Sequence, residues 1–355
     1  MKRPEWAERP ERSNLAALRA MTWASLRLGR PFGRLLLRLG TLYFVLCSPM
    51  ACRASRDYLQ RVLGRSASLR DVYRHMLTFG TTIHDRIYLM HARFDLFDIQ
   101  LQGQQHVHEA LAQGHGAFLL GAHLGSFEVV RALGRTVPDL RVAVAMYEDN
   151  ARNINAAVAA INPAAAPEII PLGRVDAMLQ VREVLDANGL VGMLADRTLL
   201  RDAGPSVQRV DFLGAPAAFP LGPLHMAAIL KRPVLFMTGL HLGSNRYAVQ
   251  FNKLADFTDL QREDRAAAVQ AALARYVEHV EHGCRTAPYN WFNFFDFWHD
   301  ASATERQPAG HSERQETPMP RHHAHCFAPA LPCSRPACWP APSMPPTFRA
   351  GRSTA

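Results

Sequence analysis

The chain has 355 residues, of which 48% are apolar and 20% are charged, and its formal net charge is +9. This is enough apolar material for a substantial core, in one large domain or two ordinary ones. The six cysteines show no paired spacing typical of metal or redox sites in the body of the chain. The sequence therefore demands no disulfide framework and favours a reducing, cytoplasmic-side location.

The excess of positive charge is an N-terminal property. Residues 1–70 carry 14 Lys/Arg and 4 Asp/Glu, whereas residues 71–300 carry 20 and 24. A basic arm of this kind can face nucleic acid or anionic lipid head groups. Here it is interleaved with Leu, Phe, Trp and Tyr and leads into the most apolar stretch of the chain. That context favours a membrane surface.

The apolar stretch over residues 35–52 has nearly the length of a membrane span, but Arg38, Gly40 and Pro49 interrupt it. A clean spanning helix needs about 20 apolar residues, and the cleavage pattern of a removed signal peptide is missing. We expect a retained anchor, either a short, imperfect span or an interfacial helix. The alternative is a buried hairpin of core helices.

The rest of the chain favours an α/β fold. Helical spacing over 13–30 and 54–90 is followed, from about residue 103, by short apolar runs that alternate with amphipathic helices. Strands that are apolar throughout predict a largely parallel sheet flanked by helices. Strands are expected over 117–122, 142–146, 168–172, 190–195 and 234–239, with an edge strand over 247–253; helices are expected over 126–136, 151–161, 175–188, 217–230 and 263–284.

The character of the sequence changes beyond Asp300. The last 55 residues hold ten of the 24 prolines and almost no aliphatic periodicity, so we expect them to be disordered. They also contain a cluster that suggests metal binding, although accidental His and Cys in an unselected tail is the favoured interpretation. That cluster is His322, His323, His325 and Cys326, with Cys333 and Cys338 nearby. Three regions result: a basic helical anchor region (1–68), an α/β domain (69–300) and a tail (301–355).

The most informative stretch is where an apolar run ends at Ala122 and His123 follows. Ser126 can cap a helix that contains Glu128. On one continuous helix His123 and Glu128 would lie about 140° apart, but at a strand-to-helix junction the chain can fold back and let them meet. Glu128 would then hold one imidazole nitrogen protonated while the other accepts a proton from an alcohol. The alternative is a structural histidine at the end of a strand.

The stretch HLGSFE (123–128) resembles the signature of glycerolipid acyltransferases, in which four residues separate a histidine from an acid. Specifically, it is similar to the lipid A late acyltransferase (lauroyl/myristoyl transferase-like) family of the lysophospholipid acyltransferase superfamily. In one departure, Tyr147 is followed by Glu-Asp-Asn where many members have Arg-Pro, which is closer to the aryl-polyene/xanthomonadin-associated branch. The resemblance covers about residues 20–298 and continues, in chain order, in Arg53–Gly64, Gly189–Arg197, Val210–Val234 and Tyr276–Trp298.

The resemblance implies transfer of an acyl group from an acyl-carrier-protein or coenzyme A thioester to a hydroxyl of a lipid or glycolipid, without metal or other cofactor. It implies His123 as general base and Glu128 as the acid that orients it, so alanine at either position should abolish transfer. It also implies the cytoplasmic side of a bacterial-type inner membrane, with acyl carrier protein, the acceptor lipid and the membrane as partners and no nucleic acid.

Other residues are candidates for substrate binding, each with a plainer alternative. For the arginines and Asp196 the alternatives are helix capping, a solvated helix start or a structural ion pair, and for the aromatic residues core packing or a turn. The candidates are Gly125, Ser126, Arg152, Arg174, Asp196, Arg197, Phe212, Gly214 and Trp291.

Other functions fit the sequence less well. A serine hydrolase or thioesterase needs an activated nucleophile, but the chain has no Gly-x-Ser-x-Gly elbow and Ser126 lies in Leu-Gly-Ser-Phe. A non-catalytic membrane-binding protein would leave the placement of His123 and Glu128 unexplained. Nucleic-acid binding lacks a recognisable reading module.

Overall fold

The computed structural model of the chain describes residues 15–134, 137–147, 156, 158, 161–198 and 206–298. The tail (301–355), Arg152, the first 14 residues and most of the helix expected over 151–161 lie outside the described residues. The expectations placed on those segments stay predictions.

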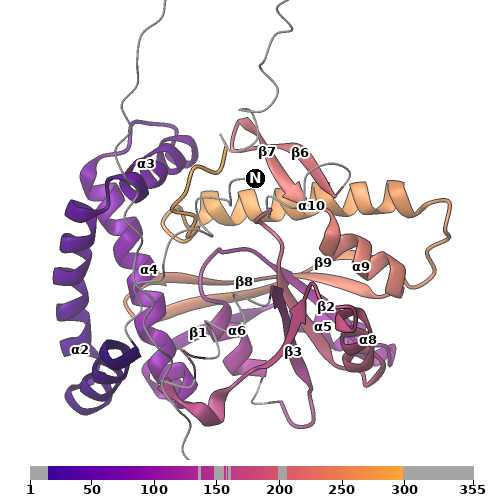
Figure 1. Cartoon of the computed structure of the whole chain (residues 1–355), viewed down its shortest axis with the longest axis horizontal. Coiled ribbons are helices and arrows are strands. Elements are labelled where there is room, and N and C mark those ends of the chain that lie inside the picture. Colours follow the sequence, from indigo (N-terminus) through magenta and orange to yellow (C-terminus); the bar gives the residue numbers. More distant parts are fainter. Residues whose placement is uncertain are drawn as a thin grey trace, which may run out of the picture. The chain divides into compact units, whose positions relative to one another are not determined.

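A seven-stranded sheet lies at the centre of the described fold (Figure 1). Its strand order is β1-β9-β8-β2-β5-β3-β4, and each neighbouring pair is parallel except β8 with β9. The predicted α/β fold with a largely parallel sheet is thus confirmed. The strands are β1 (Asp98–Gln102), β2 (Ala117–Gly121), β3 (Val142–Tyr147), β4 (Glu168–Leu172), β5 (Leu190–Leu194), β8 (Pro233–Gly243) and β9 (Arg246–Asp256).

The segment expected as an edge strand is internal. It forms β9, and β1 pairs with it in parallel on the side away from β8. The strand β1 has only five residues and lies where no strand is expected from the sequence. The prediction of an edge at 247–253 is therefore wrong, because a short strand too weakly patterned to recognise covers that edge.

A small hairpin replaces the start of the helix expected over 217–230. Its strands are β6 (Val207–Phe212) and β7 (Ala215–Pro220). Leu213 and Gly214 have φ values of 52° and 79° and close a two-residue turn. Pro220 would break a helix at this point, so the helix α9 (Gly222–Leu230) begins only after it.

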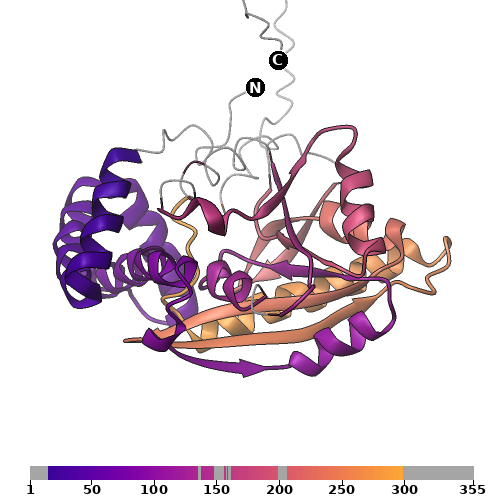
Figure 2. The same cartoon turned by 90° about the horizontal axis from the view of Figure 1, so that it is seen from below.

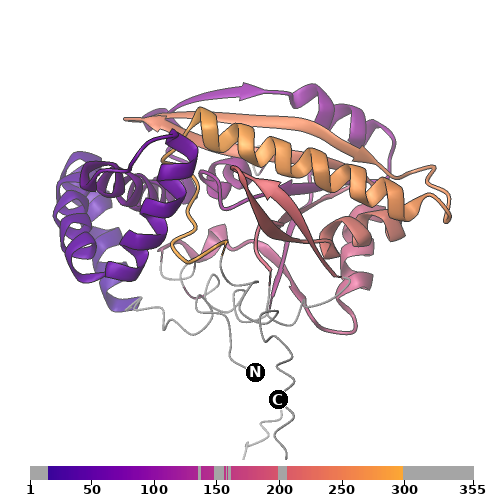
Figure 3. The same ribbon diagram turned by 90° about the horizontal axis from the view of Figure 1, so that it is seen from above.

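Alternate residues of the strands face two separate hydrophobic cores. Phe118 and Leu120 of β2 belong to the core beneath α8, α9 and α10, whereas Leu119 belongs to the one formed with α5 and α6. Figure 3 shows α10 in front of the sheet, and Figure 2, from the opposite side, shows it behind. Because both faces are covered, the central strands are apolar throughout. The helices are α5 (Gln104–Ala112), α6 (Phe127–Gly134), α8 (Ala177–Asp186), α9 and α10 (Arg265–Thr286).

Three helices precede the sheet: α2 (Leu15–Cys47), α3 (Pro49–Leu63) and α4 (Leu69–Met90). The helical stretch expected over 54–90 is split at Gly64, which adopts the left-handed conformation that ends α3. Within α2 the backbone breaks at Gly29, with φ 82° and ψ 168°. The helix α2 packs along α4, at the left of Figure 1.

In the part of the chain that the structure describes, no single helix is long and apolar enough to cross a membrane. The helices α2 and α3, bent by 97° where they meet, pass that test of length and composition only as a pair. One side of α2 is a row of exposed apolar side chains that includes Leu35, Leu39, Leu42, Tyr43 and Leu46. The helix is therefore amphipathic, with its polar contacts on the side of α4.

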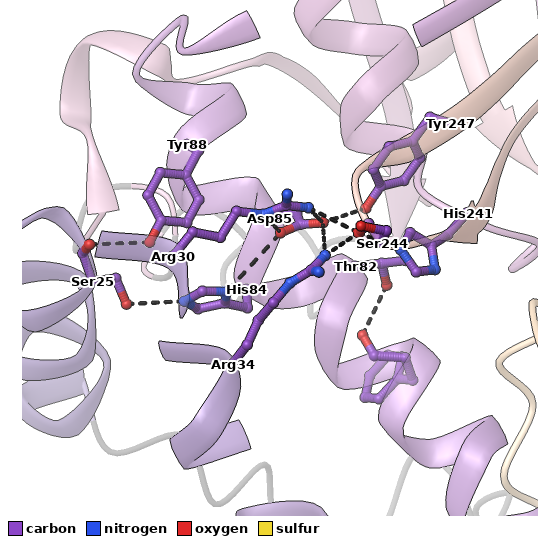
Figure 4. A network of polar contacts seen from close by, with 11 residues as sticks. Ser25, Arg30, Arg34, Thr82, His84, Asp85, Tyr88, His241, Ser244 and Tyr247 are labelled. Atoms are coloured by element: carbon purple, nitrogen blue, oxygen red, sulfur yellow. Dashed lines mark hydrogen bonds and ion pairs between the residues drawn. The ribbon is translucent and has the colours of Figure 1, made fainter. Parts of the chain in front are cut away.

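A buried ion-pair network joins α2 to α4 and to the turn between β8 and β9 (Figure 4). The carboxylate of Asp85 has no exposed surface and accepts hydrogen bonds from Arg30 Nε and Nη2 at 2.9 and 2.7 Å. It also accepts one from the Tyr247 hydroxyl at 2.9 Å. Arg34 lies 3.7 Å from the same carboxylate and donates to the carbonyl of Ser244. Three elements are thereby held around one buried charge.

Candidate active site

The candidate site begins with two neighbouring strands that end at the same level. The strands β2 and β5 are parallel and hydrogen-bonded, with Gly121 opposite Leu194. His123 and Asp196 each lie two residues beyond these positions, so the register brings them side by side at the carboxyl edge of the sheet. This is the edge at which open α/β sheets bind ligands.

A short hydrogen bond joins the two side chains. The distance between His123 Nδ1 and Asp196 Oδ1 is 2.7 Å, and the backbone N–H of His123 donates to Asp196 Oδ2 at 3.0 Å. Asp196 has no exposed side-chain surface, whereas the imidazole is 28% exposed. The buried carboxylate therefore fixes the imidazole through Nδ1, while part of the ring stays accessible to solvent.

The segment after α10, residues 287–298, supplies further hydrogen bonds to Asp196. Trp291 Nε1 and Asn293 Nδ2 each donate to Asp196 Oδ2 at 3.1 Å. Asn293 Oδ1 accepts a hydrogen bond from Arg197 Nε at 2.7 Å. The backbone N–H of Phe292 donates to the carbonyl of His123 at 2.7 Å. This segment thus fixes both members of the His123–Asp196 pair.

The loop after His123 lies between β8 and the segment after α10 and forms hydrogen bonds with both. The backbone N–H of Gly125 donates to the carbonyl of Asn290 at 2.8 Å, and the backbone N–H of Ser126 donates to the carbonyl of Gly239 at 2.7 Å. At Gly125 the φ is +76°, and an added Cβ would run into the carbonyl oxygen of Gly239. Only glycine fits this passage, so Gly125 shapes the loop that carries His123 into α6.

The electrostatics favour a neutral imidazole beside a charged carboxylate at neutral pH. Burial and the charge of Arg197 lower the pKa of His123 below its ordinary 6.5, although Asp196 acts in the opposite direction. Burial opposes ionisation of Asp196, yet His123 and Arg197 hold the pKa of its carboxyl well below the usual range. Burial lowers the pKa of Arg197 to about 10, which leaves it charged.

The protonation of the two imidazole nitrogens follows from this. A charged carboxylate can only accept hydrogen bonds, so His123 Nδ1 carries the proton that it donates to Asp196. No described residue forms a hydrogen bond with Nε2 of His123. That nitrogen therefore has a free lone pair, which is what a general base requires.

The family model for bacterial lipid A biosynthesis acyltransferases matches residues 66–299. The matched range contains the whole sheet, the His123–Asp196 pair and the segment after α10. The chain belongs to this family. A search of curated proteins finds no match. Family membership makes the protein an acyltransferase of lipid biosynthesis, and the helices α2 and α3 precede the matched range.

In the described structure, no hydrogen bond or ion pair joins Glu128 of this acyltransferase to His123. Its carboxylate accepts hydrogen bonds from Arg131 Nη2 and Nε at 2.6 and 3.1 Å, and both side chains are more than 90% buried. The expected meeting of His123 and Glu128 is thus not formed in the structure. The carboxylate in contact with the imidazole is that of Asp196, and a catalytic role for Glu128 stays a prediction.

The other predicted site residues divide into two groups. Gly125, Ser126, Asp196, Arg197 and Trp291 surround His123, whereas Arg174 lies on the surface in an ion pair with Asp176 at 3.2 Å. The hydroxyl of Ser126 is buried and has no hydrogen-bond partner among the described residues. It is therefore not paired with His123 as the nucleophile of a serine hydrolase would be.

Two more predicted residues, Phe212 and Gly214, lie at the end of β6 and in the turn that follows it. Phe212 is fully buried and packs against Trp291, with ring centroids 5.3 Å apart. Gly214 belongs to the turn between β6 and β7, as expected for a residue that shapes a turn. Phe212 therefore supports the indole that donates to Asp196, and neither residue contacts the imidazole in the described hydrogen bonds.

Asn293 is a residue of the site that the sequence alone does not predict. It bridges Asp196 and Arg197, yet it lies in an aromatic run and has no recognisable spacing of its own. The pairing of His123 with Asp196 could have been found, because each residue follows the start of its apolar run by six positions. In the described part of the chain, no three or more His, Cys, Asp or Glu residues are grouped so that they could hold a metal ion.

Proposed function

We propose that the protein transfers a fatty acyl group from a thioester to a hydroxyl of a lipid or glycolipid, with His123 as general base and Asp196 as the residue that orients it. The observation that carries this proposal is the 2.7 Å contact between His123 Nδ1 and the buried carboxylate, which leaves Nε2 free. Membership in the acyltransferase family supports the reaction class.

In the proposed reaction the acceptor hydroxyl attacks the thioester carbonyl while its proton passes to His123 Nε2. The resulting imidazolium is stabilised by Asp196 through Nδ1. When the tetrahedral intermediate collapses, the carbon–sulfur bond breaks and the thiolate takes the proton from His123. The products are an ester and a free thiol, and the histidine returns to its starting state.

The start of α6 is suited to stabilise the developing oxyanion. This helix begins at Phe127, directly after the loop that carries His123, so its first backbone N–H groups are free of intrahelical partners. The buried hydroxyl of Ser126, which has no hydrogen-bond partner among the described residues, is an additional donor at this point. Donors fixed before the substrate arrives are effective in lowering the barrier.

We further propose acyl carrier protein or coenzyme A as the thiol of the donor, no metal or other cofactor, and the cytoplasmic face of a bacterial inner membrane as the location. The exposed apolar row on α2 supports interfacial binding, because exposed apolar patches of this kind mark interaction surfaces. The network around Asp85 supports a fixed orientation of that row relative to the sheet.

The test of the catalytic proposal is His123→Ala in the purified full chain, assayed with acyl thioesters and extracted lipid acceptors. We expect transfer to fall to background while the thermal unfolding temperature and vesicle binding stay at the wild-type level. The loss reflects removal of the base, which contributes about 10²- to 10⁴-fold by proton transfer alone. Wild-type transfer by a folded His123→Ala protein would refute the mechanism.

The membrane proposal predicts that charge on the apolar side of α2 weakens binding to anionic vesicles. Leu39 and Leu46 are 61% and 71% exposed, so Leu39→Glu with Leu46→Glu should not disturb folding. We expect vesicle affinity to fall on the order of 10- to 100-fold, because two leucine side chains no longer enter the lipid interface. Vesicle sedimentation measures this.

The matched control is Leu179→Glu on α8, where the leucine is 68% exposed but lies outside α2. This substitution should leave vesicle affinity unchanged. Equal losses for both variants would show a charge effect without a role for α2, and no loss for the α2 variant would remove the interfacial assignment.

A further inference from the structure

Arg86 lies on the side of α4 that faces the candidate site. It follows Phe79 by seven residues and His75 by eleven, so the three side chains share one face of the helix. His75 Nε2 is 2.8 Å from the carbonyl of Trp291, and Phe79 packs on Phe292. The helix α4 also packs against α6, which carries Glu128.

Arg86 forms no hydrogen bond or ion pair with any described residue, although the charge of Glu128 acts on it from nearby. Its Nε is sealed from solvent. The other arginines of this region are paired: Arg131 with Glu128, Arg197 with Asn293, and Arg30 with Asp85. A sealed donor without a hydrogen-bond partner destabilises a fold, so it calls for an explanation.

The charges around the site point to the kind of ligand. Arg86, Arg131 and Arg197 contribute three positive charges, while Glu128 and Asp196 contribute two negative ones. Arg86 is close enough to His123 for its charge to contribute to the lowered pKa of that imidazole. These described residues therefore carry one positive charge in excess, and it arises where Arg86 and Arg131 lie around the single carboxylate of Glu128.

We propose that Arg86 forms an anion subsite beside His123 and Asp196 that binds a phosphate group of one of the two substrates. Guanidinium matches a phosphate with two parallel hydrogen bonds, which suits a residue with several free donors. The phosphate is either that of a phosphopantetheine donor arm or one on the acceptor lipid. The assignment to a substrate rests on the proposed acyl transfer.

Binding is tested first without turnover, by thermal unfolding of the full chain in inorganic phosphate against chloride at equal ionic strength. Phosphate should raise the unfolding temperature of the wild type and leave that of Arg86→Met unchanged, because a ligand stabilises only the state that binds it. An equal rise in both proteins would overturn the subsite.

The same experiment separates a binding role from a structural one. Without phosphate, Arg86→Met should unfold at or above the wild-type temperature, because it removes an unpaired charge. The matched control is Arg30→Met, which strips Asp85 of its bidentate partner and should unfold several degrees lower. A comparable fall for Arg86→Met would make Arg86 structural and overturn the proposal.

Kinetics then identify the source of the phosphate. If it belongs to the donor, replacing an acyl-phosphopantetheine by the acyl-pantetheine should lower the wild-type kcat/KM about 10- to 100-fold and leave that of Arg86→Met unchanged. If the phosphate belongs to the acceptor, removing it from a glycolipid acceptor should lower the wild-type kcat/KM about 10- to 100-fold and leave that of Arg86→Met unchanged. Sensitivity of both proteins to each phosphate would overturn the subsite.

The experiments distinguish failure of the proposed acyl transfer from failure of the anion subsite at Arg86. Phosphate stabilisation that depends on Arg86, in a wild type without any acyl transfer, would keep the subsite and refute the proposed function. Transfer by the wild type with equal kinetics in Arg86→Met for both substrate pairs would keep the function and refute the subsite.

Discussion

Replacing Asp196 by Asn is expected to lower kcat for acyl transfer by about 10³- to 10⁴-fold, as loss of the acid behind a catalytic histidine does elsewhere. The reason lies in the hydrogen bonds of the two carboxylate oxygens. Oδ2 accepts from the N–H of His123, from Trp291 and from Asn293, so the asparagine oxygen must take that place. The amide NH₂ then faces Nδ1 and forces the proton onto Nε2, which can no longer act as a base.

The pH dependence adds a second measurement. The pKa of His123 is already below 6.5 because of burial, so kcat/KM of the wild type should be level near pH 7 and fall only below pH 6.5 as the imidazole becomes protonated. Asp196 raises that pKa, and its removal should move the acid limb of the profile to lower pH. An acid limb that shifts upward in Asp196→Asn would contradict the assigned contact.

Glu128→Gln tests the alternative that Glu128, rather than Asp196, orients His123. It keeps the size of the side chain but weakens the buried pair with Arg131, so we expect a lower unfolding temperature and a smaller loss of kcat than for Asp196→Asn. The folded fraction must be measured in the same samples. If Glu128→Gln abolished turnover of the folded protein while Asp196→Asn remained active, Glu128 would be the orienting acid.

Replacing Asp85 by Ala is expected to destabilise the protein by about 3–5 kcal/mol, because it leaves two partly buried arginines without their counter-charge. Arg30 has a side-chain exposure of 12% and loses both of its bonds to the carboxylate, and the Tyr247 hydroxyl loses its acceptor. For a domain of this size the unfolding temperature should fall on the order of 10 °C. Calorimetry or denaturant titration measures the change.

The matched control for Asp85 is Asp57→Ala. Asp57 pairs with Arg61 at 3.3 Å, but the two side chains are 38% and 25% exposed. An exposed pair of this kind contributes about 0–1 kcal/mol, so the control should behave nearly as the wild type does. If Asp85→Ala were as stable as Asp57→Ala, the network would not hold α2 in place.

Much of the fold is predictable because its central strands are apolar on both faces. Short apolar runs such as 117–122 and 190–195 favour strands buried inside a covered parallel sheet, and the structure places both there. The strand β1 could not be predicted, because it is short and mostly exposed and takes its conformation from pairing with β9. The β6–β7 hairpin depends on the positive φ of Leu213, which no local signal requires.

The candidate site is predictable in part for a similar reason. His123 stands out because it follows an apolar strand directly, and Asp196 does the same after the next strand of the sheet. Sequence proximity pointed to Glu128, whereas strand register selected a carboxylate 73 residues away. Asn293 could not be found at all, because its contacts depend on how the segment after α10 returns to the sheet.

The segment that carries Trp291 and Asn293 is also among the last parts of the family region to be synthesised. Its contacts with Asp196 span 95 and 97 residues, so the surroundings of the imidazole are among the late, non-local contacts of folding. A nascent chain on the ribosome can build the sheet and α10 while Asp196 still lacks these donors. Under the proposed mechanism we therefore expect acyl transfer to begin only after nearly the whole family region has emerged.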